Sequence, residues 1–571
     1  MENKTKTISV MKKSLLIISA LALCGAAFAQ SNENSAVVNI ENEYTPEVIK
    51  VSKKGNTPTI AKDEEMEPLE LEFIEKAEPF RGFTSERDIK DVLPTQKSQF
   101  PGYARLGYGL TNDIDAKLAY NLKTSKNGEL NMLAGFDGFK TGIKGEEVDW
   151  DQRMFRTTAG ASYTHRFKGL EMGVAADFSN RVFNYQHTDG YGTAVMTPGF
   201  TDKQNSRTYR LSTTGVSDLD NELACSYVAG VTYNRRSYSS GMEEGTGEFT
   251  FNLGGQVAFS IGEENLKNVG MDLGVDGLFY NSTLRNAPSG YANYASFDIN
   301  PFLNFDFSGW KVKIGTRVNF ITANGARVAV APDIKIKGNF NKFVGMYGEI
   351  TGGRSVNRLA DIEEEMPYWG FNGATDRQLC PTYRVVDLKA GAHLTIEPVS
   401  FDVYAGYAYT KDDVLQTMGY QQDPSSSVQA FRFIYAGFAQ QNTHNFFVGG
   451  RAGCDIGGWT SLSAEARYDK WGGADDNLLM MKPQITAEVN ADFRVFEKLT
   501  FRLGYNFTRY TKGDSVRYNC KNDLYARASY QIFDWLGAYI QGNNLLNCDY
   551  YEYAGYRARG ARGSLGVTAN F

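Results

Sequence analysis

The sequence predicts an all-β protein: a transmembrane antiparallel β-barrel of about 22 strands, preceded by a short irregular N-terminal segment. Three observations lead to this prediction: a secretory leader, long alternating strand patterns without an apolar helix after the leader, and connections that alternate between short and long. Composition agrees, because aromatic residues make up 13% of the 571 residues and Gly (58) far outnumbers Pro (15). Such usage is typical of strands and tight turns.

The leader is the first element. It begins at Met11 with two lysines, continues as the apolar run "SLLIISALALCGAAF", and offers a small-residue cleavage site ending at Ala29. We therefore expect residues 1–29 to be a signal peptide. Cys24 permits a rival interpretation as a lipid-modified cysteine, but Leu23 before it is larger than such a signal requires. Cleavage removes four lysines and one glutamate, so the net charge changes from -6 to -9 (-6 - 3).

The polar residues exclude several classes of protein. A mildly acidic chain without a basic block is not expected to bind nucleic acid. There is no C-x-x-C, and the four histidines are scattered, so neither a metal site nor a cofactor is expected. There is no G-x-S-x-G motif and no recognisable Ser/His/Asp arrangement. We therefore do not expect an enzyme.

Residues 30–100 differ from the rest of the chain. They include the acidic stretch "AKDEEMEPLELEFIEKAEPF" and carry no sustained strand period. We expect them to form a periplasmic or lumenal segment, and residues 101–571 to form the barrel.

The barrel prediction rests on strands of unusual length. In "LTFRLGYNFTRY", residues 499–510, apolar and polar side chains alternate along the whole stretch. "PQITAEVNADF", "WKVKIGTRVNF" and "SLSAEARYD" repeat the pattern. Strands of about 10 to 14 residues match a tilted crossing of a bilayer, whereas soluble strands have about 5 to 6 residues.

Counting the connections gives the strand number. Long connections are expected around residues 190, 245, 288, 364, 426, 473, 512 and 550. The short connections between them are "LKTSKNGE", "RFKGL", "SDLDNEL", "GEENLKN", "DFSGW", "NFNKF", "IEPVS", "DIGGWT", "RVFEKL" and "IFDWLG". Residues 411–444 contain the apolar piece "QAFRFIYAGF", and counting it as a strand would give 23. We therefore expect residues 411–444 to be one long outer loop, and about 22 strands in total.

The last strand explains why the chain ends on an aromatic residue. Apolar and small side chains alternate up to Phe571, as expected for a strand that closes the barrel and cannot fray. A terminal Phe is also expected to be the signal for the outer-membrane assembly machinery. Trp310, Trp459 and Trp535 each adjoin a short connection, so we expect them at the periplasmic face of the lipid.

The end of the chain, "QGNNLLNCDYYEYAGYRARGARGSLGVTANF", resembles the end of the barrel of TonB-dependent receptors. The resemblance implies a location in the cell outer membrane, in contact with its lipid, and a role in transport. Such receptors carry a plug domain of well over a hundred residues, whereas residues 30–100 supply only about seventy. The sequence therefore predicts a plugless relative, and we do not expect an energy-coupling partner.

Charged side chains on the lumenal faces of the predicted strands are candidate lumen-lining residues. The basic candidates are Lys311, Lys313, Arg317, Lys335 and Lys337. The acidic candidates are Glu465, Asp469, Glu488 and Asp492. They are expected to set up a field across the lumen that orients polar solutes or binds the acidic N-terminal segment. The alternative is that a water-filled interior simply requires polar side chains.

Two functional hypotheses follow. The first is a transport protein that passes or gates polar solutes; the second is a barrel that anchors a surface lipoprotein or a periplasmic partner. The segment expected to decide between them is the predicted loop with Phe431, Phe433, Tyr435 and Phe438: inside the lumen it indicates a gate, and outside it indicates a partner surface.

Two further features belong to the predicted outer loops. Cys520 and Cys548 fall on neighbouring loops, where an oxidising compartment would permit a disulfide. The acidic run of residues 363–365 is expected to be either solvated surface or a contact for a cation or a glycan.

Overall fold

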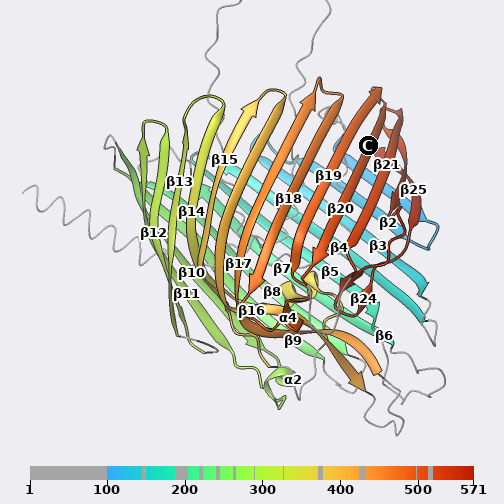
Figure 1. The fold of residues 1–571 in the computed structure, drawn as a ribbon, viewed down its shortest axis with the longest axis horizontal. Coiled ribbons are helices and arrows are strands. Elements are labelled where there is room, and N and C mark those ends of the chain that lie inside the picture. Colours follow the sequence, from blue (N-terminus) through green and yellow to red (C-terminus); the bar gives the residue numbers. More distant parts are fainter. Residues whose placement is uncertain are drawn as a thin grey trace, which may run out of the picture.

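A computed structural model confirms the all-β barrel (Figure 1). It describes residues 100–143, 150–187, 203–217, 223–238, 245–261, 265–288, 290–323, 325, 327–370, 377–422, 432–496, 498–511 and 519–571. The predicted signal peptide and residues 30–99 of the predicted N-terminal segment lie outside the described residues.

The wall begins with eleven strands, taken in order around the barrel. They are β1 (Gly102–Gly109), β2 (Ile114–Lys123), β3 (Gly128–Ile143), β4 (Trp150–Phe167), β5 (Leu170–Asn184), β7 (Lys203–Ser217), β8 (Leu223–Tyr238), β9 (Thr246–Ser260), β10 (Leu266–Tyr280), β11 (Tyr294–Phe307) and β12 (Trp310–Ile321).

Eleven further strands complete the wall. They are β13 (Val328–Asn339), β14 (Val344–Ser355), β15 (Thr382–Ile396), β16 (Val399–Gln422), β17 (Arg432–Ile456), β18 (Thr460–Gly472), β19 (Pro483–Phe496), β20 (Leu499–Tyr510), β21 (Lys521–Phe533), β22 (Leu536–Asn543) and β25 (Arg562–Asn570). The connections carry the smaller elements β6 (Gln186–His187), α2 (Ser282–Arg285), α3 (Leu359–Glu365), α4 (Asp476–Leu479), β23 (Tyr551–Tyr553) and β24 (Tyr556–Arg557).

The sheet closes on itself, which confirms the predicted 22 antiparallel strands. The last strand β25 pairs with β1, with Ala569 opposite Ala104. Phe571 extends this pairing, since its backbone N–H donates to the Gly102 carbonyl at 3.0 Å and its carbonyl accepts from the Gly102 N–H at 2.8 Å. The chain end is therefore held by the first strand and leaves no open edge.

The two faces of the wall differ as the alternation predicts. Large apolar side chains point outward, for example Leu565 (62% exposed) beside Ile540 (61%). Charged pairs point inward, as where Arg105 donates to the Asp115 carboxylate at 2.6 Å. Trp459 and Trp535 are exposed beside short connections, where an interfacial belt would place them. No helix among the described residues is long and apolar enough to cross a bilayer.

The predicted short connections are confirmed, because each joins two consecutive paired strands. The prediction for residues 411–444 was wrong. Residues 411–422 extend β16 and residues 432–444 extend β17, and the two extensions pair with each other. The strand count was nevertheless even, because existing strands are lengthened and none is added.

Candidate gate at the outer mouth

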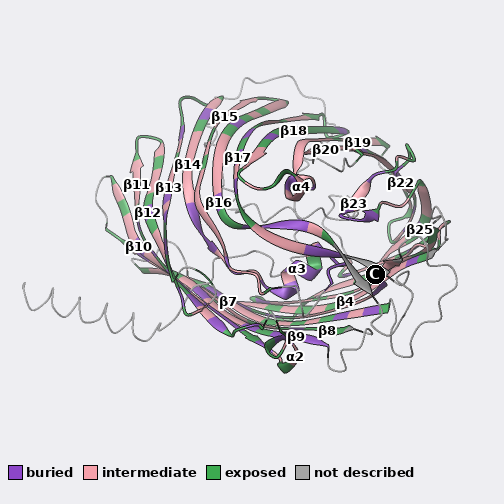
Figure 2. Ribbon diagram, turned by 60° about the horizontal axis from the view of Figure 1, so that its bottom comes forward, coloured by how far each residue is buried: buried purple, intermediate pink, exposed green. Residues whose placement is uncertain are grey.

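Two inserts lie at the end of the barrel opposite Phe571, which is the outer end in the predicted topology (Figures 1 and 2). The first is α3 with residues 366–370 after it, from the connection between β14 and β15. The second is the paired extension of β16 and β17, residues 411–422 and 432–444, which we call the strap. Figure 2 shows α3 inside the ring of strands and the strap crossing that ring. Together they cover part of the outer mouth.

Charged groups dock α3 on the inner wall. Arg358, just before the helix, is buried and forms an ion pair with Asp276 of β10. The N–H of Leu359, the first helical residue, donates to the Glu248 carboxylate of β9 at 2.8 Å. The helix therefore reaches from its own strands to a distant part of the wall. Breaking a buried ion pair by removing one partner costs about 3–5 kcal/mol, so this docking is firm.

The acidic end of α3 is held by the neighbouring strands β7 and β5. Ser206 donates to the buried Glu363 carboxylate, and Arg181 donates to the Glu363 carbonyl. Arg210 donates to the Glu364 carboxylate at 2.9 Å, although the Glu364 side chain is half exposed. The acidic run of residues 363–365 is therefore solvated only in part, because Glu363 is buried while Glu364 is exposed. Glu363 and Glu364 already have a hydroxyl and a basic partner in the wall, and a contact of the run with a cation or a glycan stays a prediction.

The environment of α3 shifts the pKa values of its carboxyl groups in opposite directions. Burial, and then the nearby charges of Asp361 and Glu364, raise the pKa of Glu365 to about 8. Burial also raises the pKa of Asp361. Burial disfavours the Glu364 carboxylate too, but the Arg210 guanidinium outweighs it and lowers the pKa of Glu364. Glu365 is therefore the group on the helix that takes up a proton near neutral pH.

The strap leaves the wall through a bend. The pairing of β16 with β17 shifts register between Thr410 and Asp413, and Asp412 adopts a left-handed φ of 53°. Such a bulge bends a strand pair. The Asp413 carboxylate accepts from the Thr443 hydroxyl at 2.7 Å and from Lys482 at 3.0 Å. Lys482 therefore joins the base of the strap to the connection between β18 and β19.

The far end of the strap pairs with other outer segments. The Ala436 N–H donates to the Tyr368 carbonyl at 2.9 Å, and the Gly370 N–H donates to the Ala436 carbonyl at 3.0 Å. Further along, Phe433 pairs with His187 of β6, from the opposite wall. The strap is thus fixed at its base and at its far end.

A buried aromatic cluster unites these segments. The latch cluster consists of Phe183, Tyr185, Met366, Tyr368, Ala436, Tyr553 and Tyr556. Its members come from β5, the segment after α3, the strap and the hairpin β23–β24. The rings of Tyr368 and Tyr556 stack with 3.9 Å between centroids, and Gln152 of β4 donates to the Tyr368 hydroxyl at 2.8 Å. Residues from four separate outer connections therefore pack together in one core.

Arg236 of β8 lies beneath this cluster and is completely buried. Its guanidinium lies 4.9 Å from the ring centroid of Phe183 and 5.6 Å from that of Trp369. It donates to the Tyr185 hydroxyl at 2.8 Å, and Glu363 is 3.9 Å away. One cation thus holds both the aromatic rings and the helix α3.

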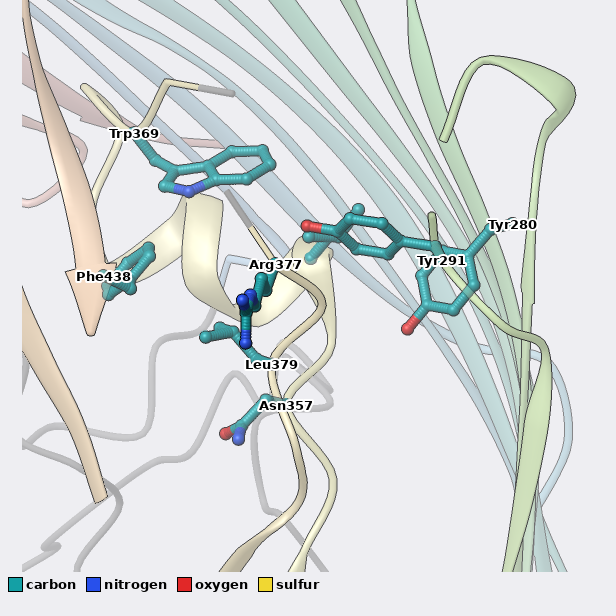
Figure 3. A pocket seen from close by; sticks show the side chains of 8 residues that line it. Tyr280, Tyr291, Asn357, Trp369, Arg377, Leu379 and Phe438 are labelled. Atoms are coloured by element: carbon teal, nitrogen blue, oxygen red, sulfur yellow. The ribbon is translucent and has the colours of Figure 1, made fainter. Parts of the chain in front are cut away.

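A narrow pocket separates the strap from α3 (Figure 3). Trp369 and Phe438 lie on one side of it, Tyr280 and Tyr291 on the other, with Arg377 between them. The pocket has a volume of about 20 Å³, which is room for one or two water molecules. The outer inserts are thus closely packed at this point.

The predicted gate residues divide into three groups. Phe431 lies outside the described residues. Phe433 and Tyr435 belong to β17, where Tyr435 pairs with Gly419. Phe438 is partly buried and packs against the latch cluster and the pocket. The Phe438 side chain is thus turned toward the other outer inserts.

The register brings the basic lumen candidates together. Lys311 lies opposite Lys337, and Lys313 lies opposite Lys335, on the adjacent strands β12 and β13. Lys313 forms an ion pair with Asp333 at 2.9 Å. Arg317 lies further along the same inward face and donates to the Gly352 carbonyl at 3.2 Å.

The acidic candidates lie on β18 and β19, where Glu465 faces Glu488 directly. Each has a polar partner in the same wall. Arg451 donates to Glu465 at 3.3 Å, Arg502 donates to Asp492 at 2.6 Å, Arg467 donates to Asp469 at 2.8 Å, and Asn490 donates to Glu488 at 3.0 Å. The two faces of opposite sign are thus separate, and each is partly neutralised locally.

The predicted disulfide is not formed in this structure. Cys520 and Cys548 are free thiols, although their loops adjoin, since Asn519 donates to the Asp549 carbonyl at 3.2 Å. The physical reason is local: the Cys548 thiol turns toward the Leu546 carbonyl, 3.9 Å away in its own loop.

Sequence reasoning did not identify Arg236, Tyr368 or Trp369, which hold the outer inserts together. No local pattern marks them, because their partners come from strands far away in the sequence. Among the described residues, no group of three His, Cys, Asp or Glu side chains is arranged to hold a metal ion.

Comparison with known proteins identifies the fold. No protein-family model and no curated protein matches the chain. A point mutant of the ferric enterobactin receptor from Pseudomonas aeruginosa matches with a TM-score of 0.60 and 10% identity, over 83% of this chain and 81% of that one. The siderophore receptor PirA from Acinetobacter baumannii gives 0.60 and 11%, over 82% and 80%. The ferripyoverdine receptor of the outer membrane of Pseudomonas aeruginosa gives 0.59 and 11%, over 83% and 72%.

These structures are TonB-dependent siderophore receptors, so the predicted resemblance is confirmed at the level of the barrel. At identities of 10–11%, the likeness concerns the fold.

Proposed function

We propose that this chain is an outer-membrane transport barrel for polar solutes, and that α3 and the strap form a gate at its outer mouth. The observation that carries the proposal is the position of the strap: Ala436 is completely buried in the latch cluster, and Phe438 packs against that cluster. A segment that packs across the outer mouth is useful in a transport protein, whose passage must open for the solute and close afterwards. A barrel that only anchored a partner would have no such requirement.

The fold and the lumen support this proposal. The solved receptors for ferric enterobactin and ferripyoverdine share the barrel fold. The inward faces of the wall carry charged and amide side chains, such as Asn300 beside Asp272 and Asp333. Such a lining suits a hydrated polar solute.

The gate has a base and a latch, which suggests how it opens. At the base, Lys482 holds Asp413 beside the bulge. At the far end, the latch cluster holds Ala436 through Tyr368. Releasing the latch while the base stays in place would swing the strap away from α3. A solute that offers better partners to the latch residues would shift the population toward the open gate.

The alternative is a barrel that anchors a surface or periplasmic partner. Its expected signature is an apolar outer surface on the strap. Phe438 packs inward instead, so the transport hypothesis is the better supported of the two.

Planar-bilayer conductance tests the proposal. We would compare the mature chain and a form lacking residues 30–99, each with an intact latch and with Tyr368→Ala plus Tyr556→Ala. Tyr468→Ala is the matched control, because Tyr468 is an exposed residue of β18 far from the latch cluster. The truncated form should conduct more when its latch is cut, and the control should not change it. Equal conductance with cut and intact latches would contradict the gate.

A further inference from the structure

We propose that a basic patch on the lipid-facing side of the wall binds a phosphorylated lipid in the outer leaflet of the membrane. The basic patch consists of Arg153 of β4, Lys203 and Arg207 of β7, and Arg235 of β8. This inference concerns the outside of the barrel, so it does not depend on the gate in the mouth.

The two central arginines of the patch point away from the lumen. Arg207 lies directly opposite Arg235 in the β7–β8 ladder, and both residues are exposed. Their neighbours Ser206 and Arg236 are buried and face α3. Successive side chains alternate between the two faces of a strand. Arg207 and Arg235 therefore lie on the outer face.

The other two cations lie on the same face. Gln152, next to Arg153, is buried and points inward to the latch cluster. Gln204, next to Lys203, is buried and lies opposite Phe183 of that cluster. By the same alternation, Arg153 and Lys203 point outward. The four cations thus share one side of the wall.

Few carboxylates accompany these cations. Among the described residues, the outer faces of β5, β7, β8 and β9 carry Lys203, Arg207 and Arg235 but no Asp or Glu. Asp151 of β4 is already paired with Lys140 of β3 at 2.9 Å. Like charges directly opposite each other in a sheet repel. Lys203 and Arg235 make other contacts as well, but each has several N–H donors and can also bind an anion between the strands.

The opposite side of the wall shows that a lipid-facing surface does not need cations. The lipid-facing positions described on β11, β12 and β13 carry no charged residue. Phe320 lies ten residues from Trp310, the periplasmic end of β12. Arg207 lies ten residues from Ser217, the periplasmic end of β7. At the same height, one strand thus presents an exposed Phe and the other an exposed Arg, so the patch is a local feature.

The height of the patch matches the headgroup layer of the outer leaflet. Ten residues at about 3.3 Å each, in a strand tilted by about 40°, rise about 25 Å along the barrel axis. The apolar band of such barrels is also about 25 Å tall, so Arg207 lies at its outer edge. Arg235, twelve residues from Leu223, lies about 5 Å further out. Lys203 and Arg153, each fourteen residues from the periplasmic end of its strand, lie about 10 Å further out than Arg207.

Aromatic side chains lie below the two arginines, on the membrane side. Tyr209 and Tyr233 are the next outward residues on β7 and β8, and both are exposed. Their ring centroids are 6.4 Å apart, and Phe178 of β5 adds a ring 5.1 Å from Tyr209. Rings at this level contact acyl chains at the edge of the headgroup layer. Guanidinium groups bind phosphate oxygens in pairs. Cations above rings thus match a phosphorylated headgroup above acyl chains, whereas an acidic protein would match the cations alone.

Native mass spectrometry of the folded full-length mature protein in detergent tests this assignment. The probes are lipid A with both phosphates and the same lipid A after removal of its phosphates. We expect the phosphorylated lipid to bind about tenfold more tightly or better. Arg207→Gln with Arg235→Gln should remove about tenfold of its affinity, because charge-assisted hydrogen bonds to phosphate are lost.

Lys470→Gln is the matched control. Lys470 is exposed on the outer face of β18, ten residues from Thr460, and is therefore at the height of Arg207. Figure 2 shows β18 and β7 on opposite sides of the ring. The control should bind the phosphorylated lipid as the unchanged protein does. Heat-dependent migration on gels establishes that each variant is folded. Equal binding of the two lipids, or undiminished binding by the folded double variant, would overturn the proposal.

Photo-cross-linking provides a second measurement in the membrane. Ser237 is exposed two residues beyond Arg235 on the same face of β8, opposite Asn205. With a photoreactive residue at this position, isolated outer membranes should yield an adduct with the phosphorylated lipid, and the double variant should yield less. An adduct with a protein in its place, or an equal lipid adduct in the double variant, would refute the assignment. Neither measurement involves the latch cluster, so failure here is distinguishable from failure of the gate.

Discussion

The ring of Tyr368 stacks on the ring of Tyr556 with 3.9 Å between centroids and 12° between planes, although the two residues belong to different outer connections. Tyr368 follows α3, and Tyr556 begins β24 in the last outer connection. Both are almost completely buried. The two segments do not pair with each other as strands. Side-chain packing therefore closes the mouth at this point.

Removal of the Tyr556 ring should open the gate. Tyr556→Ala loses the stacking and leaves a cavity, at a cost of about 3–5 kcal/mol. Tyr556→Phe keeps the ring and loses the hydrogen bond from the Gln186 N–H at 3.2 Å, at a cost of about 1 kcal/mol. We expect faster proteolysis of the outer connections for Ala and little change for Phe. Equal cleavage of both variants would show that the ring does not hold the mouth closed.

Arg236 should be necessary for the docking of α3. Arg236→Met keeps much of the volume but removes the cation beside the buried Glu363 carboxylate, which costs about 3–5 kcal/mol locally. Hydrogen exchange of α3 should become faster while exchange of the wall strands is unchanged. Arg166→Met is a suitable control, since the Arg166 side chain is 75% exposed in its pair with Glu171. Unchanged exchange in α3 would refute the role of Arg236.

The base of the strap should depend on one ion pair. Lys482→Met removes the ammonium at 3.0 Å from Asp413 and should raise the mobility of residues 436–444, as measured by spin labels or hydrogen exchange. Asp413→Asn in the same chain should restore much of the order, because the neutral amide no longer needs a cation and can still bond to Thr443. If the double variant were as mobile as Lys482→Met alone, the charge pair would not be the cause.

The gate should close more firmly in acid. The pKa of Glu365 is raised to about 8 by burial and by Asp361 and Glu364, so docking of α3 takes up a proton. The closed state is therefore favoured below about pH 4.5, and it is weakened progressively as the pH rises to about 8, by at most about tenfold per pH unit.

Conductance of the form lacking residues 30–99 measures this dependence. Between pH 5.5 and 8.5 the open probability should rise with pH, and Glu365→Gln should remove most of the rise, since glutamine cannot ionise. Protonation of Glu364 has the opposite effect, because it weakens the closed state. It occurs only at lower pH, since Arg210 lowers the pKa of Glu364. A falling open probability, or an unchanged rise in the Gln variant, would contradict the assignment to Glu365.

Local patterns were sufficient for the wall. The alternation in residues 499–510 predicts which side chains face lipid, and Phe501 and Leu503 are exposed on the outer face while Arg502 bonds to Asp492 inside. The period of two is a property of each strand alone, so no knowledge of its neighbours is required. The strand number is then even, because the first strand begins and the last strand ends at the same end of the barrel.

The strap shows where local patterns fail. "QAFRFIYAGF" has the residues of a strand, but the even strand number excluded an added strand. The segment could still be a loop or lengthen two existing strands. The choice between these depends on which other segments it pairs with. Gln441 and Asp413 pair across the extension, next to its bulge, and β6 meets its far end. Those contacts lie between segments that are far apart in sequence.

The sequence alone determined the closed cylinder, its inward and outward faces and the position of its last strand, because these follow from a two-residue period and from the requirement that every backbone polar group in lipid be paired. Only the tertiary structure decided what lies in the outer mouth. The acidic run of α3 resembles solvated surface until Arg210 and Ser206 of β7 approach it from the wall. Whether a carboxylate is buried depends on cations supplied by other strands, and no short stretch of sequence carries that information.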